Sequence, residues 1–467
     1  MSIMYKLDFN KKIHIYFIGI GGISMSGFAE LLHKEGFQVS GSDSQKNNIT
    51  MHLESLGINI FYGQDEKNIS KTYDLIVYTA AIHEDNPEFR KAQELGIPML
   101  NRAQMVGQVM KNYANAIAVS GTHGKTTTTS MLSMMMLSGQ LDPTISVGGI
   151  LEAIHGNIRV GDSENFITEA CEYTDSFLNF HPTRSIILNV EAEHLDYFKD
   201  LAQVRHSFFT FANLLPEEGT LVINGEIDSV SELTAMTKAK VITYGVIDDT
   251  FHGKVDVSAR NVKYNELGCG TYDLYQGEEM IGSIELRTVG RHNISNSVAA
   301  IAMALDMGIS IQAIQEALST FTGTHRRFEY KGQFNGVTVI DDYAHHPTEI
   351  EACLDGARRY PHKELWCAFQ PHTYTRTKNF LQDFARALSN ADHIVLADIY
   401  AAREQDPGDI SSNDLKRELE ALGKDVSYFH TFEEIEKFLI NNCTNGDLLI
   451  TMGAGNIVSV GENLLSK

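Results

Sequence analysis

Residues 118–130 hold the pattern of residue types in this chain that most directly predicts chemistry. They read Ala-Val-Ser-Gly-Thr-His-Gly-Lys-Thr-Thr-Thr-Thr-Ser and continue a small, apolar run that is typical of a buried strand. Gly121 and Gly124 bracket a tight turn, and Lys125 opens a helical run. The backbone N–H groups of such a turn and the positive end of the helix bind phosphate. The pattern predicts a nucleotide-phosphate loop, although Val119 stands where the usual spacing has its first glycine.

The residue types inside this loop predict which groups touch the nucleotide. In loops of this kind the lysine reaches the β- and γ-phosphates and the next hydroxyl holds Mg²⁺. Lys125 and Thr126 occupy those two positions. The expected nucleotide-binding set is Gly121, Thr122, His123, Gly124, Lys125, Thr126 and Thr127. The alternative is a strand-to-helix turn that contains Gly-Lys-Thr by chance.

Acidic residues follow two further predicted strands. The run 166–169 ends in Glu169, with Glu172 three residues later, and the run 186–190 leads into Glu191-Ala-Glu-His194-Leu-Asp196. Mg²⁺ prefers carboxylate oxygens, water and substrate phosphates as ligands. We expect the metal residues to be Thr126, Glu169 and His194. For His194 a simple capping or packing role remains open.

A second glycine turn lies near the N-terminus, at Gly19-Ile-Gly21-Gly22-Ile23-Ser24. It follows a β-rich run, precedes a helix expected at 24–34, and is followed by a strand that ends in Asp43. The pattern is similar to a dinucleotide fingerprint with serine in place of the third glycine, so an NAD-dependent dehydrogenase is one interpretation. The phosphate loop at 121–126 is the stronger motif of the two and argues against a dehydrogenase, because hydride transfer does not require the binding of ATP-type phosphates. The diphosphate of a UDP-sugar, or a turn without ligand, remains open.

Paired charges and histidines follow the strands expected in the last third of the chain. Arg326 and Arg327 lie at a domain join, where an arginine pair is either solvated or able to clamp a phosphate. Further on come Asp-Asp-Tyr-Ala-His-His-Pro at 341–347 and Gln-Pro-His-Thr-Tyr-Thr-Arg at 370–376. Ligands gather at the carboxyl ends of strands in an open parallel sheet. We therefore expect the third part of the chain to contribute one edge of a ligand-binding site.

The elements that position these groups alternate between strand and helix, which indicates parallel α/β sheets. A chain of 467 residues is too long for one core. We expect three parts, at residues 1–110, 111–322 and 323–467. In the second part, three alternating runs predict a small antiparallel patch, at 255–260, 271–275 and 283–286, before a helix at 295–307.

Composition excludes several classes of protein. The net charge of −22 would repel a nucleic-acid backbone, so no nucleic-acid partner is expected. The five cysteines form no Cys-x-x-Cys pair and indicate reduced thiols in a cytoplasm. No run approaches the ~20 apolar residues of a membrane span, and no leader pattern is visible, so no membrane insertion is expected.

Taken together, the motifs resemble those of the Mur ligase family. The resemblance rests on Gly-Thr-His-Gly-Lys-Thr at 121–126, Gly-Arg-His-Asn at 290–293, Arg-Arg-Phe-Glu at 326–329, Asp-Asp-Tyr-Ala-His-His-Pro-Thr-Glu at 341–349 and Phe-Gln-Pro-His at 369–372. It spans all three parts. It implies a Rossmann-like N-terminal domain that binds a UDP-sugar, a central P-loop ATPase-like α/β domain with the antiparallel patch, and a Rossmann-like C-terminal domain that closes on ATP and the amino acid.

The resemblance also implies substrates and roles. The implied substrates are ATP with Mg²⁺, UDP-N-acetylmuramate and L-alanine, and we expect a monomer or a homodimer. The implied UDP-sugar residues are Gly19, Gly21, Gly22, Ile23, Ser24, Asp43 and Arg102. The implied catalytic residues are Lys125, His194, Arg327 and His345, with Asn293 at the adenine, Arg327 at the phosphates and Asp342 at the nucleotide.

The implied chemistry is ligation through an acyl phosphate, because a carboxylate does not react with an amine at neutral pH. His123, His345, His346 and His372 are all candidates for the base that deprotonates the amine. A family member that attaches a recycled murein tripeptide is the nearest alternative, and Glu349 favours alanine. The alternative from another class of protein is a non-catalytic UDP-sugar sensor with a degenerate ATPase. Such a sensor would lack the loop lysine or an acidic metal ligand, and this sequence has both.

Several positions depart from the family pattern, beginning with Ser24, which stands where glycine is frequent. Cys171 stands in a stretch that is often more acidic, and Thr373 stands where arginine is frequent. Several sibling ligases carry a lysine, carbamylated by CO₂, in the helix after the metal histidine. Arg205 takes that position here. A guanidinium stays protonated, so we expect no carbamate in this protein.

Overall fold

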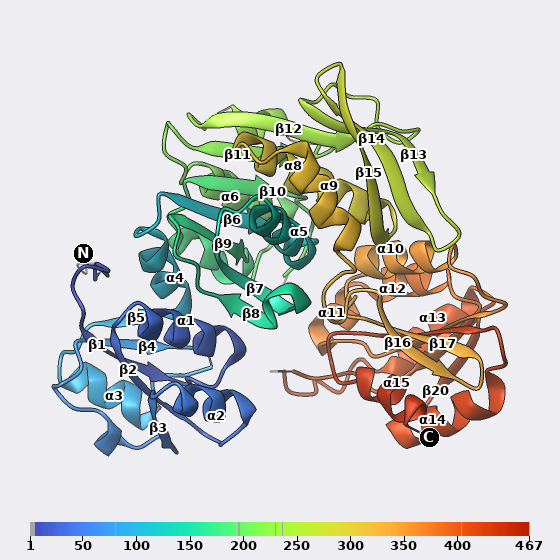
Figure 1. Cartoon of the computed structure of the whole chain (residues 1–467). Helices are drawn as coiled ribbons and strands as arrows, with labels where there is room; N and C mark the ends of the chain where they lie inside the picture. The colour runs from blue at the N-terminus through green and yellow to red at the C-terminus, as the bar shows by residue number, and fades with distance from the viewer. Residues whose placement is uncertain are drawn as a thin grey trace. The chain divides into compact units, whose positions relative to one another are not determined.

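The structure is a computed structural model that describes residues 5–79, 81–194, 197–228, 230–235, 237–402 and 404–466. The chain divides into two compact units, each described here by itself. Unit 1 comprises Met1–Tyr244 with Ala299–Ser310, and unit 2 comprises Gly245–Val298 with Ile311–Lys467. Figure 1 follows the chain by colour from the N-terminus to the C-terminus. Among the described residues, no helix is both long and apolar enough to cross a bilayer.

The first sheet of unit 1 is entirely parallel, with strand order β3-β2-β1-β4-β5. Its strands are β1 (His14–Ile18), β2 (Gln38–Asp43), β3 (Asn59–Tyr62), β4 (Leu75–Tyr78) and β5 (Met99–Asn101). The helices are α1 (Ile23–Lys34), α2 (Asn48–Ser55), η1 (Glu66–Asn68), α3 (Pro87–Glu94) and α4 (Arg102–Met110). Strand order reverses beside β1, which is where ligands bind in open α/β sheets.

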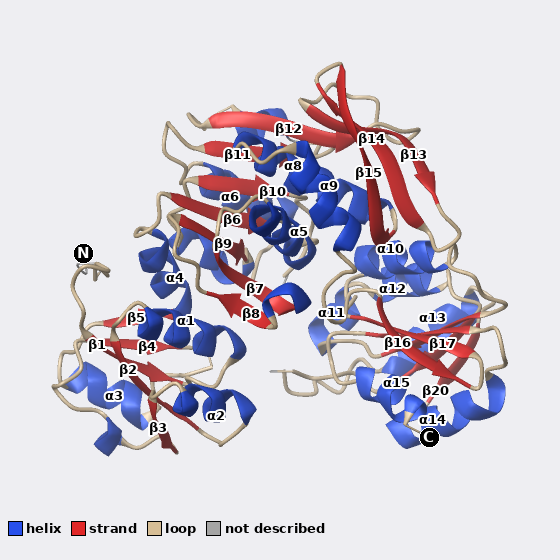
Figure 2. Ribbon diagram, in the orientation of Figure 1, coloured by secondary structure: helices blue, strands red, loops and turns tan. Residues whose placement is uncertain are grey.

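Strand β1 shows how the sequence places helices on both faces of this sheet. Ile15 and Phe17 pack in one hydrophobic cluster with Phe28 of α1. Tyr16 and Ile18 pack in a second cluster that includes α3. Successive side chains of a strand point to opposite faces, so a strand that is apolar throughout needs a cover on each side. Figure 2 shows these helices against the strands.

The second sheet of unit 1 is mainly parallel and has the order β12-β11-β10-β6-β9-β7-β8. Its strands are β6 (Asn115–Ser120), β7 (Thr144–Leu151), β8 (Gly156–Arg159), β9 (Asn165–Ala170), β10 (Arg184–Ile187), β11 (Thr220–Asn224) and β12 (Lys240–Val246). The helical segments are α5 (Lys125–Ser138), η2 (Glu152–Ile154), η3 (Tyr173–Asn179), α6 (Leu201–Ala212) and α7 (Val230–Thr234). Since β6 lies between β9 and β10, the loops after these three strands meet at one edge.

Helix α4 joins the two sheets of unit 1 by packing directly on backbone. A Cβ built on Gly107 would lie 1.9 Å from the carbonyl oxygen of Asn179, the last residue of η3. Only a residue without a side chain fits at such an approach. Segment η3, which begins directly after Glu172, is therefore in contact with α4, the helix that follows the last strand of the first sheet.

Unit 2 begins with the antiparallel patch, in the order β13-β14-β15. These strands are β13 (Val257–Tyr264), β14 (Cys269–Gln276) and β15 (Glu279–Val289), followed by α8 (Arg291–Asp306) and α9 (Ile311–Thr320). Helix α8 begins four residues before the predicted start at 295. Its first turn is closed already by a hydrogen bond from the Asn293 N–H to the Gly290 carbonyl, at 3.2 Å.

The third sheet, also in unit 2, has the order β16-β17-β21-β18-β19-β20 and is parallel except for β16. Its strands are β16 (Glu329–Phe334), β17 (Val337–Asp342), β18 (Leu365–Phe369), β19 (His393–Leu396), β20 (Asp425–Tyr428) and β21 (Leu448–Met452). The helices are α10 (Pro347–Ala357), α11 (Tyr374–Asn379), α12 (Leu381–Leu388), α13 (Ser412–Ala421), α14 (Phe432–Asn442) and α15 (Val458–Leu465). The predicted α/β class, rich in parallel strands and with a small antiparallel patch, is confirmed.

Candidate nucleotide and metal site

The predicted phosphate loop connects β6 to α5. Strand β6 is buried, and Gly121 leaves it with φ +146° in a space where a Cβ would lie 2.8 Å from the Leu188 side chain. Gly124 precedes α5 in a left-handed conformation, with φ +85°. The glycines therefore allow the chain to turn directly onto the N-terminus of α5, the end of a helix that attracts anions.

Asn189 anchors this loop from the neighbouring strand. It follows β10, and its Oδ1 accepts a hydrogen bond from the His123 N–H at 2.7 Å while its Nδ2 donates to the His123 carbonyl at 3.1 Å. The Asn189 carbonyl accepts from the Thr122 N–H at 3.2 Å. Our sequence reasoning did not single out Asn189, although its place behind a strand next to β6 was a usable signal.

Lys125 is held by three acceptors. Its Nζ donates to the carbonyls of Gly121 at 2.5 Å and Thr122 at 3.0 Å, and to Glu172 Oε2 at 3.0 Å. Burial disfavours the charged amine, but the negative charges around it, above all that of Glu172, outweigh burial and raise the pKa of Lys125. Lys125 therefore presents a permanent positive charge inside the loop.

Thr126 and Glu169 lie together beside the lysine. The Thr126 hydroxyl donates to Glu169 Oε2 at 3.0 Å, and Glu169 Oε1 accepts a hydrogen bond from the Gly148 N–H. Two ligands in adjacent positions on octahedral Mg²⁺ are separated by about 3 Å, since each oxygen lies about 2.1 Å from the ion. The hydroxyl and carboxylate oxygens thus fit Mg²⁺ in both type and spacing.

His194 approaches the same cluster through Glu172. Its Nε2 lies 3.5 Å from Glu172 Oε1, and its ring lies 4.5 Å, between centroids, from the ring of Tyr173. Glu172 is 1% exposed. The structure thus brings Lys125, Thr126, Glu169 and His194 to one edge of the second sheet, with Glu172 between Lys125 and His194. Asp196, expected in the same cluster, lies outside the described residues.

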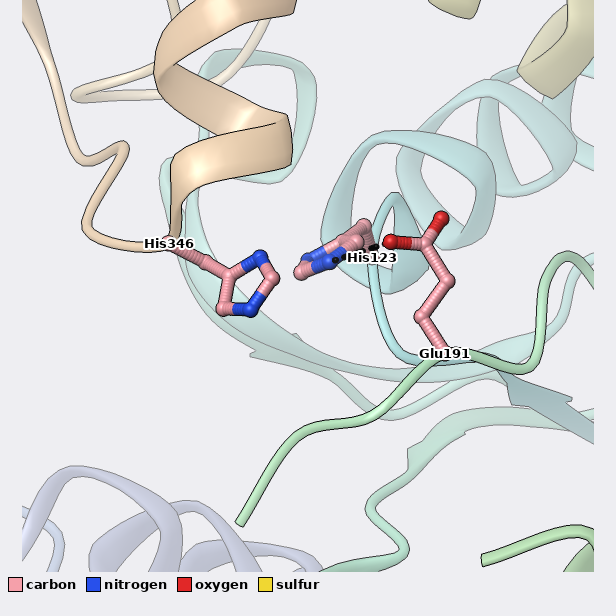
Figure 3. Close-up of side chains that lie close together, drawn as sticks. All are labelled: His123, Glu191 and His346. Atoms are coloured by element: carbon pink, nitrogen blue, oxygen red, sulfur yellow. Dashed lines mark ion pairs between the residues drawn. The ribbon is translucent and has the colours of Figure 1, made fainter. Parts of the chain in front are cut away.

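His123 adds a second pair of ionisable groups at the loop. Its Nε2 lies 3.6 Å from Glu191 Oε2, and Figure 3 shows the two side chains facing one another. His346, also drawn in Figure 3, precedes α10 in unit 2, where its Nδ1 accepts a hydrogen bond from the Thr348 N–H at 3.4 Å. A capping role thus accounts for one nitrogen of His346.

The first glycine turn also gathers its predicted residues. The Gly21 N–H donates to Asp43 Oδ2 at 2.8 Å, so this carboxylate braces the turn from the end of β2. Arg102, at the start of α4, donates to the Ser24 hydroxyl at 3.4 Å. Ile23 is 61% exposed at the first position of α1. Gly19, Gly22 and these residues lie at the carboxyl edge of the first sheet.

In unit 2, Asp342 is buried at the end of β17. It accepts hydrogen bonds from the backbone N–H groups of Phe328 and Ala344, both at 2.7 Å. Burial raises the pKa of Asp342 to about 6, against the lowering effect of the Arg327 charge and these two bonds. Asp342 is therefore an acid that titrates close to neutrality, next to a permanent cation.

Glu349 links the other two predicted residues of this edge. It lies 3.8 Å from an Arg327 nitrogen and accepts a hydrogen bond from the His345 N–H at 3.1 Å. The His345 Nδ1 is 3.1 Å from the same carboxylate and from the Tyr343 carbonyl. Arg327 and His345 are thus brought together through Glu349, a residue that the sequence interpretation used only to distinguish family members.

Asn293 lies in the first turn of α8 and is buried. Its Nδ2 donates to the Val289 carbonyl at 2.8 Å. The neighbouring His292 is exposed.

The structure shows the contacts of the residues that depart from the family pattern. Cys171 is next to the Lys125–Glu172 pair, and burial raises the pKa of its thiol, so it is a poor nucleophile. Thr373, with φ +68°, caps α11 by accepting from the Arg376 N–H at 3.4 Å. Arg205 lines a cavity of about 440 Å³ and lies 4.0 Å from Asp228. All five cysteines are free.

Comparison with known families accounts for most of the chain. Residues 14–114 match the Mur ligase family, catalytic domain, residues 119–304 match the Mur ligase middle domain, and residues 326–455 match the Mur ligase, glutamate ligase domain. The chain is 57% identical to a UDP-N-acetylmuramate–L-alanine ligase of Lachnoclostridium phytofermentans, over 99% of this chain and 100% of that protein. It is also 57% identical to the protein of that name from Agathobacter rectalis, with the same coverage.

Solved structures show the same relationship. The UDP-N-acetylmuramate–alanine ligase of Thermotoga maritima superposes with a TM-score of 0.80 at 28% identity, covering 97% of this chain and 98% of that one. A murein peptide ligase of Psychrobacter arcticus has a TM-score of 0.71 at 24% identity over 97% and 98% of the two chains, which shows a shared fold. With three matching domains and relatives this similar over the full length, the chain belongs to the Mur ligase family.

Proposed function

We propose that this chain joins L-alanine to the lactyl carboxylate of UDP-N-acetylmuramate, with hydrolysis of ATP to ADP and phosphate, in the cytoplasmic synthesis of peptidoglycan precursors. The observation that supports this most is 57% identity, over almost the whole chain, to relatives named for that reaction. The phosphate loop with its buried lysine and its hydroxyl–carboxylate pair is the machinery that such a ligation needs.

The proposed reaction has two bond-forming steps. A lactyl carboxylate oxygen attacks the γ-phosphorus of ATP, the bond to the β-phosphate oxygen breaks, and ADP leaves. The alanine amine then attacks the acyl carbon, and the tetrahedral intermediate expels inorganic phosphate. The amine loses one proton to a base on the way, because a neutral amide is formed.

The residues of the loop have separate tasks in the first step. Lys125 offsets the negative charge that builds up on the phosphates, because its pKa is held high and it is charged at every working pH. Thr126 and Glu169 would hold Mg²⁺, which neutralises phosphate charge. Asn189 keeps the loop in the shape that receives the nucleotide before the nucleotide arrives.

We assign the remaining roles on the resemblance to the family. Gly19, Gly21, Gly22, Ile23, Ser24, Asp43 and Arg102 bind the UDP-sugar. Asn293 binds adenine, Arg327 and Asp342 bind the nucleotide, and His345 accepts the amine proton. The contact of Glu349 with both Arg327 and His345 supports a common role for these two residues.

A coupled assay of phosphate release tests the proposed function. The purified chain receives ATP, Mg²⁺ and UDP-N-acetylmuramate, and then L-alanine, glycine, L-serine or a murein tripeptide in separate reactions. We expect the highest kcat/KM with L-alanine. Release that is fastest with the tripeptide would assign the recycling reaction instead, and binding of the UDP-sugar without phosphate release in any reaction would indicate a sensor.

A further inference from the structure

The guanidinium of Arg326 is bound by the protein itself and is not solvated. Only 22% of this side chain is exposed. Its Nε donates to Asp341 Oδ2 at 2.9 Å, and its two terminal nitrogens donate to the carbonyls of Gly455 at 3.0 Å and Gly453 at 2.6 Å. The planar group thus spreads its donors over three acceptors from two separate segments, the end of β17 and the loop after β21.

The carboxylate partner strengthens this tie. Asp341 is completely buried, and its other oxygen accepts a hydrogen bond from the Thr451 hydroxyl at 2.7 Å. Burial raises the pKa of Asp341, and the Thr451 hydroxyl and the charge of Arg326 oppose that rise. A buried carboxylate that loses its cation is strongly destabilised, so the fold holds the Arg326 side chain in place.

The backbone around Arg327 has an uncommon shape. Arg326, with φ +60°, and Phe328, with φ +49°, lie on either side of it in the left-handed region. Residues other than glycine adopt this region rarely, and only where surrounding contacts hold them. One such contact is the hydrogen bond from the Phe328 N–H to Asp342 Oδ2. The direction in which Arg327 leaves the chain therefore depends on contacts outside the turn.

Arg326 supplies further contacts of this kind through its own backbone. Its N–H donates to Glu329 Oε2 at 2.9 Å, and its carbonyl accepts from the Tyr343 N–H at 2.7 Å. Together with the guanidinium, these bonds fix the residue before Arg327 to the third sheet.

The Arg327 side chain is far less engaged than that of Arg326. It lies 3.8 Å from Glu349 and over the Tyr343 ring, 5.4 Å from the centroid, and among the described residues no atom accepts a hydrogen bond from its guanidinium. Arg326 lies over the same ring at 4.9 Å. One arginine of the pair thus holds the protein together, and the other has donors left for a ligand.

We propose that Arg326 is a positioning residue for Arg327, and that it fixes the direction of Arg327 by tying the turn to Asp341 and to the loop after β21. The proposal rests on the proposed function in one respect, namely that Arg327 binds nucleotide phosphate. A lysine at position 326 would keep a cation beside Asp341. Its compact ammonium does not match acceptors arranged for a planar fork, so the turn would lose its tie to the loop.

A double-mutant cycle separates this role from plain structural support. Calorimetric titration with a non-hydrolysable ATP analogue and Mg²⁺ gives affinities for wild type, Arg326→Lys, Arg327→Ala and the double variant, and urea unfolding shows whether each is folded. We expect Arg326→Lys to weaken binding by at least ~10-fold, because a charge-assisted hydrogen bond to phosphate is lost. In the Arg327→Ala background the same change is expected to weaken binding by less than ~2-fold.

Arg260→Lys is the matched control. Arg260 belongs to β13, where no ligand is assigned, and it also donates to a carbonyl and a carboxylate, those of Gly277 at 2.9 Å and Glu278 at 3.1 Å. This variant is expected to keep wild-type affinity. A loss of the same size with and without Arg327 would overturn the proposal, as would unchanged affinity in Arg326→Lys. Wild-type affinity in Arg327→Ala would instead contradict the proposed function.

Glu329→Ala keeps the proposal testable if Arg326→Lys does not fold. It removes the acceptor of the Arg326 N–H and leaves the three bonds of the guanidinium in place. In the same cycle we expect a smaller loss of affinity, which again disappears in the Arg327→Ala background. A loss that persists in that background would overturn the proposal.

Discussion

The carboxamide of Asn189 makes two hydrogen bonds to the backbone of His123, one to its N–H and one to its carbonyl. This arrangement imitates the pairing of two strands and is made by a single side chain from the end of β10. The phosphate loop is thereby held by the rigid sheet, not only by its own turn.

Replacing Asn189 therefore loosens the loop without touching the nucleotide. Each hydrogen bond contributes about 1 kcal/mol net, so Asn189→Ala is expected to weaken binding of the ATP analogue by ~10-fold to ~30-fold. Asn189→Asp keeps the acceptor for the His123 N–H and loses only the donor, so its effect is smaller. Calorimetric titration measures both affinities. Equal and unchanged affinities would show that the loop keeps its shape unaided.

Lys125→Ala is expected to abolish ligation and to leave binding of UDP-N-acetylmuramate nearly intact. The reason is that Lys125 lies at the second sheet, whereas the predicted UDP-sugar turn follows β1 of the first sheet. Titration of the variant with the UDP-sugar provides the readout. A loss of binding as large as the loss of activity would contradict two separate sites.

Phosphorylation of the carboxylate is expected to precede amine attack. The chain with ATP, Mg²⁺ and UDP-N-acetylmuramate, but without amino acid, forms an acyl phosphate that hydroxylamine converts to a hydroxamate. Mass spectrometry detects the product, and a reaction without UDP-N-acetylmuramate is the control. Hydroxamate that forms only in the presence of alanine would exclude a free acyl phosphate.

Activity is expected to be independent of bicarbonate. Arg205, which we expect at the position of the carbamylated lysine of sibling ligases, lies 4.0 Å from Asp228, and a guanidinium forms no stable carbamate. Phosphate release is therefore the same in buffer stripped of CO₂ and in buffer with added bicarbonate. Activity that is lost on stripping and restored by bicarbonate would show that a lysine elsewhere carries the carbamate.

The buried carboxyl group of Asp342 in unit 2 is expected to make the stability of the fold depend on pH. Asp342 has its pKa raised from 3.8 to about 6, so the folded state holds its proton longer than the unfolded state, and its contribution to stability falls as pH rises through this range.

Urea unfolding of Asp342→Asn at about pH 4 and about pH 6.5 measures this contribution. The free energy of unfolding of the variant, relative to wild type, is expected to increase by about 2 kcal/mol between these values, since one pKa unit corresponds to about 1.4 kcal/mol and part of the titration lies outside this range. A difference from wild type that stays constant with pH would mean that Asp342 is ionised throughout.

The fold was predictable because its signals are local. Strand β6 is a short run of small apolar residues, and β1 is apolar on both faces. Each run therefore predicts a buried parallel strand without knowledge of the neighbouring strands. The motif residues of the phosphate loop were predictable for the same reason, because the glycines, the lysine and the helix follow one another in the chain.

The supporting contacts were not predictable, because they join residues distant in sequence. Asn189 lies 66 positions from His123, and Glu172 lies 47 positions from Lys125. Asp43 was expected to bind ligand, but its hydrogen bond to the Gly21 N–H is fixed by how β2 lies beside β1. The spacing of apolar residues and the positions of turn residues carry no information about hydrogen bonds between residues that are distant in sequence.

The close approach of Gly107 to the Asn179 carbonyl has a genetic consequence. A single methyl group at position 107 would have to push apart α4 and the end of η3, since its carbon would lie 1.9 Å from a backbone oxygen. Neither Gly107 nor Asn179 is itself assigned to a ligand or to catalysis, so we expect the enzyme to lose heat tolerance before it loses its substrates. Gly107→Ala is thus a rational route to a conditional allele, one that supports wall growth in the cold and fails on warming.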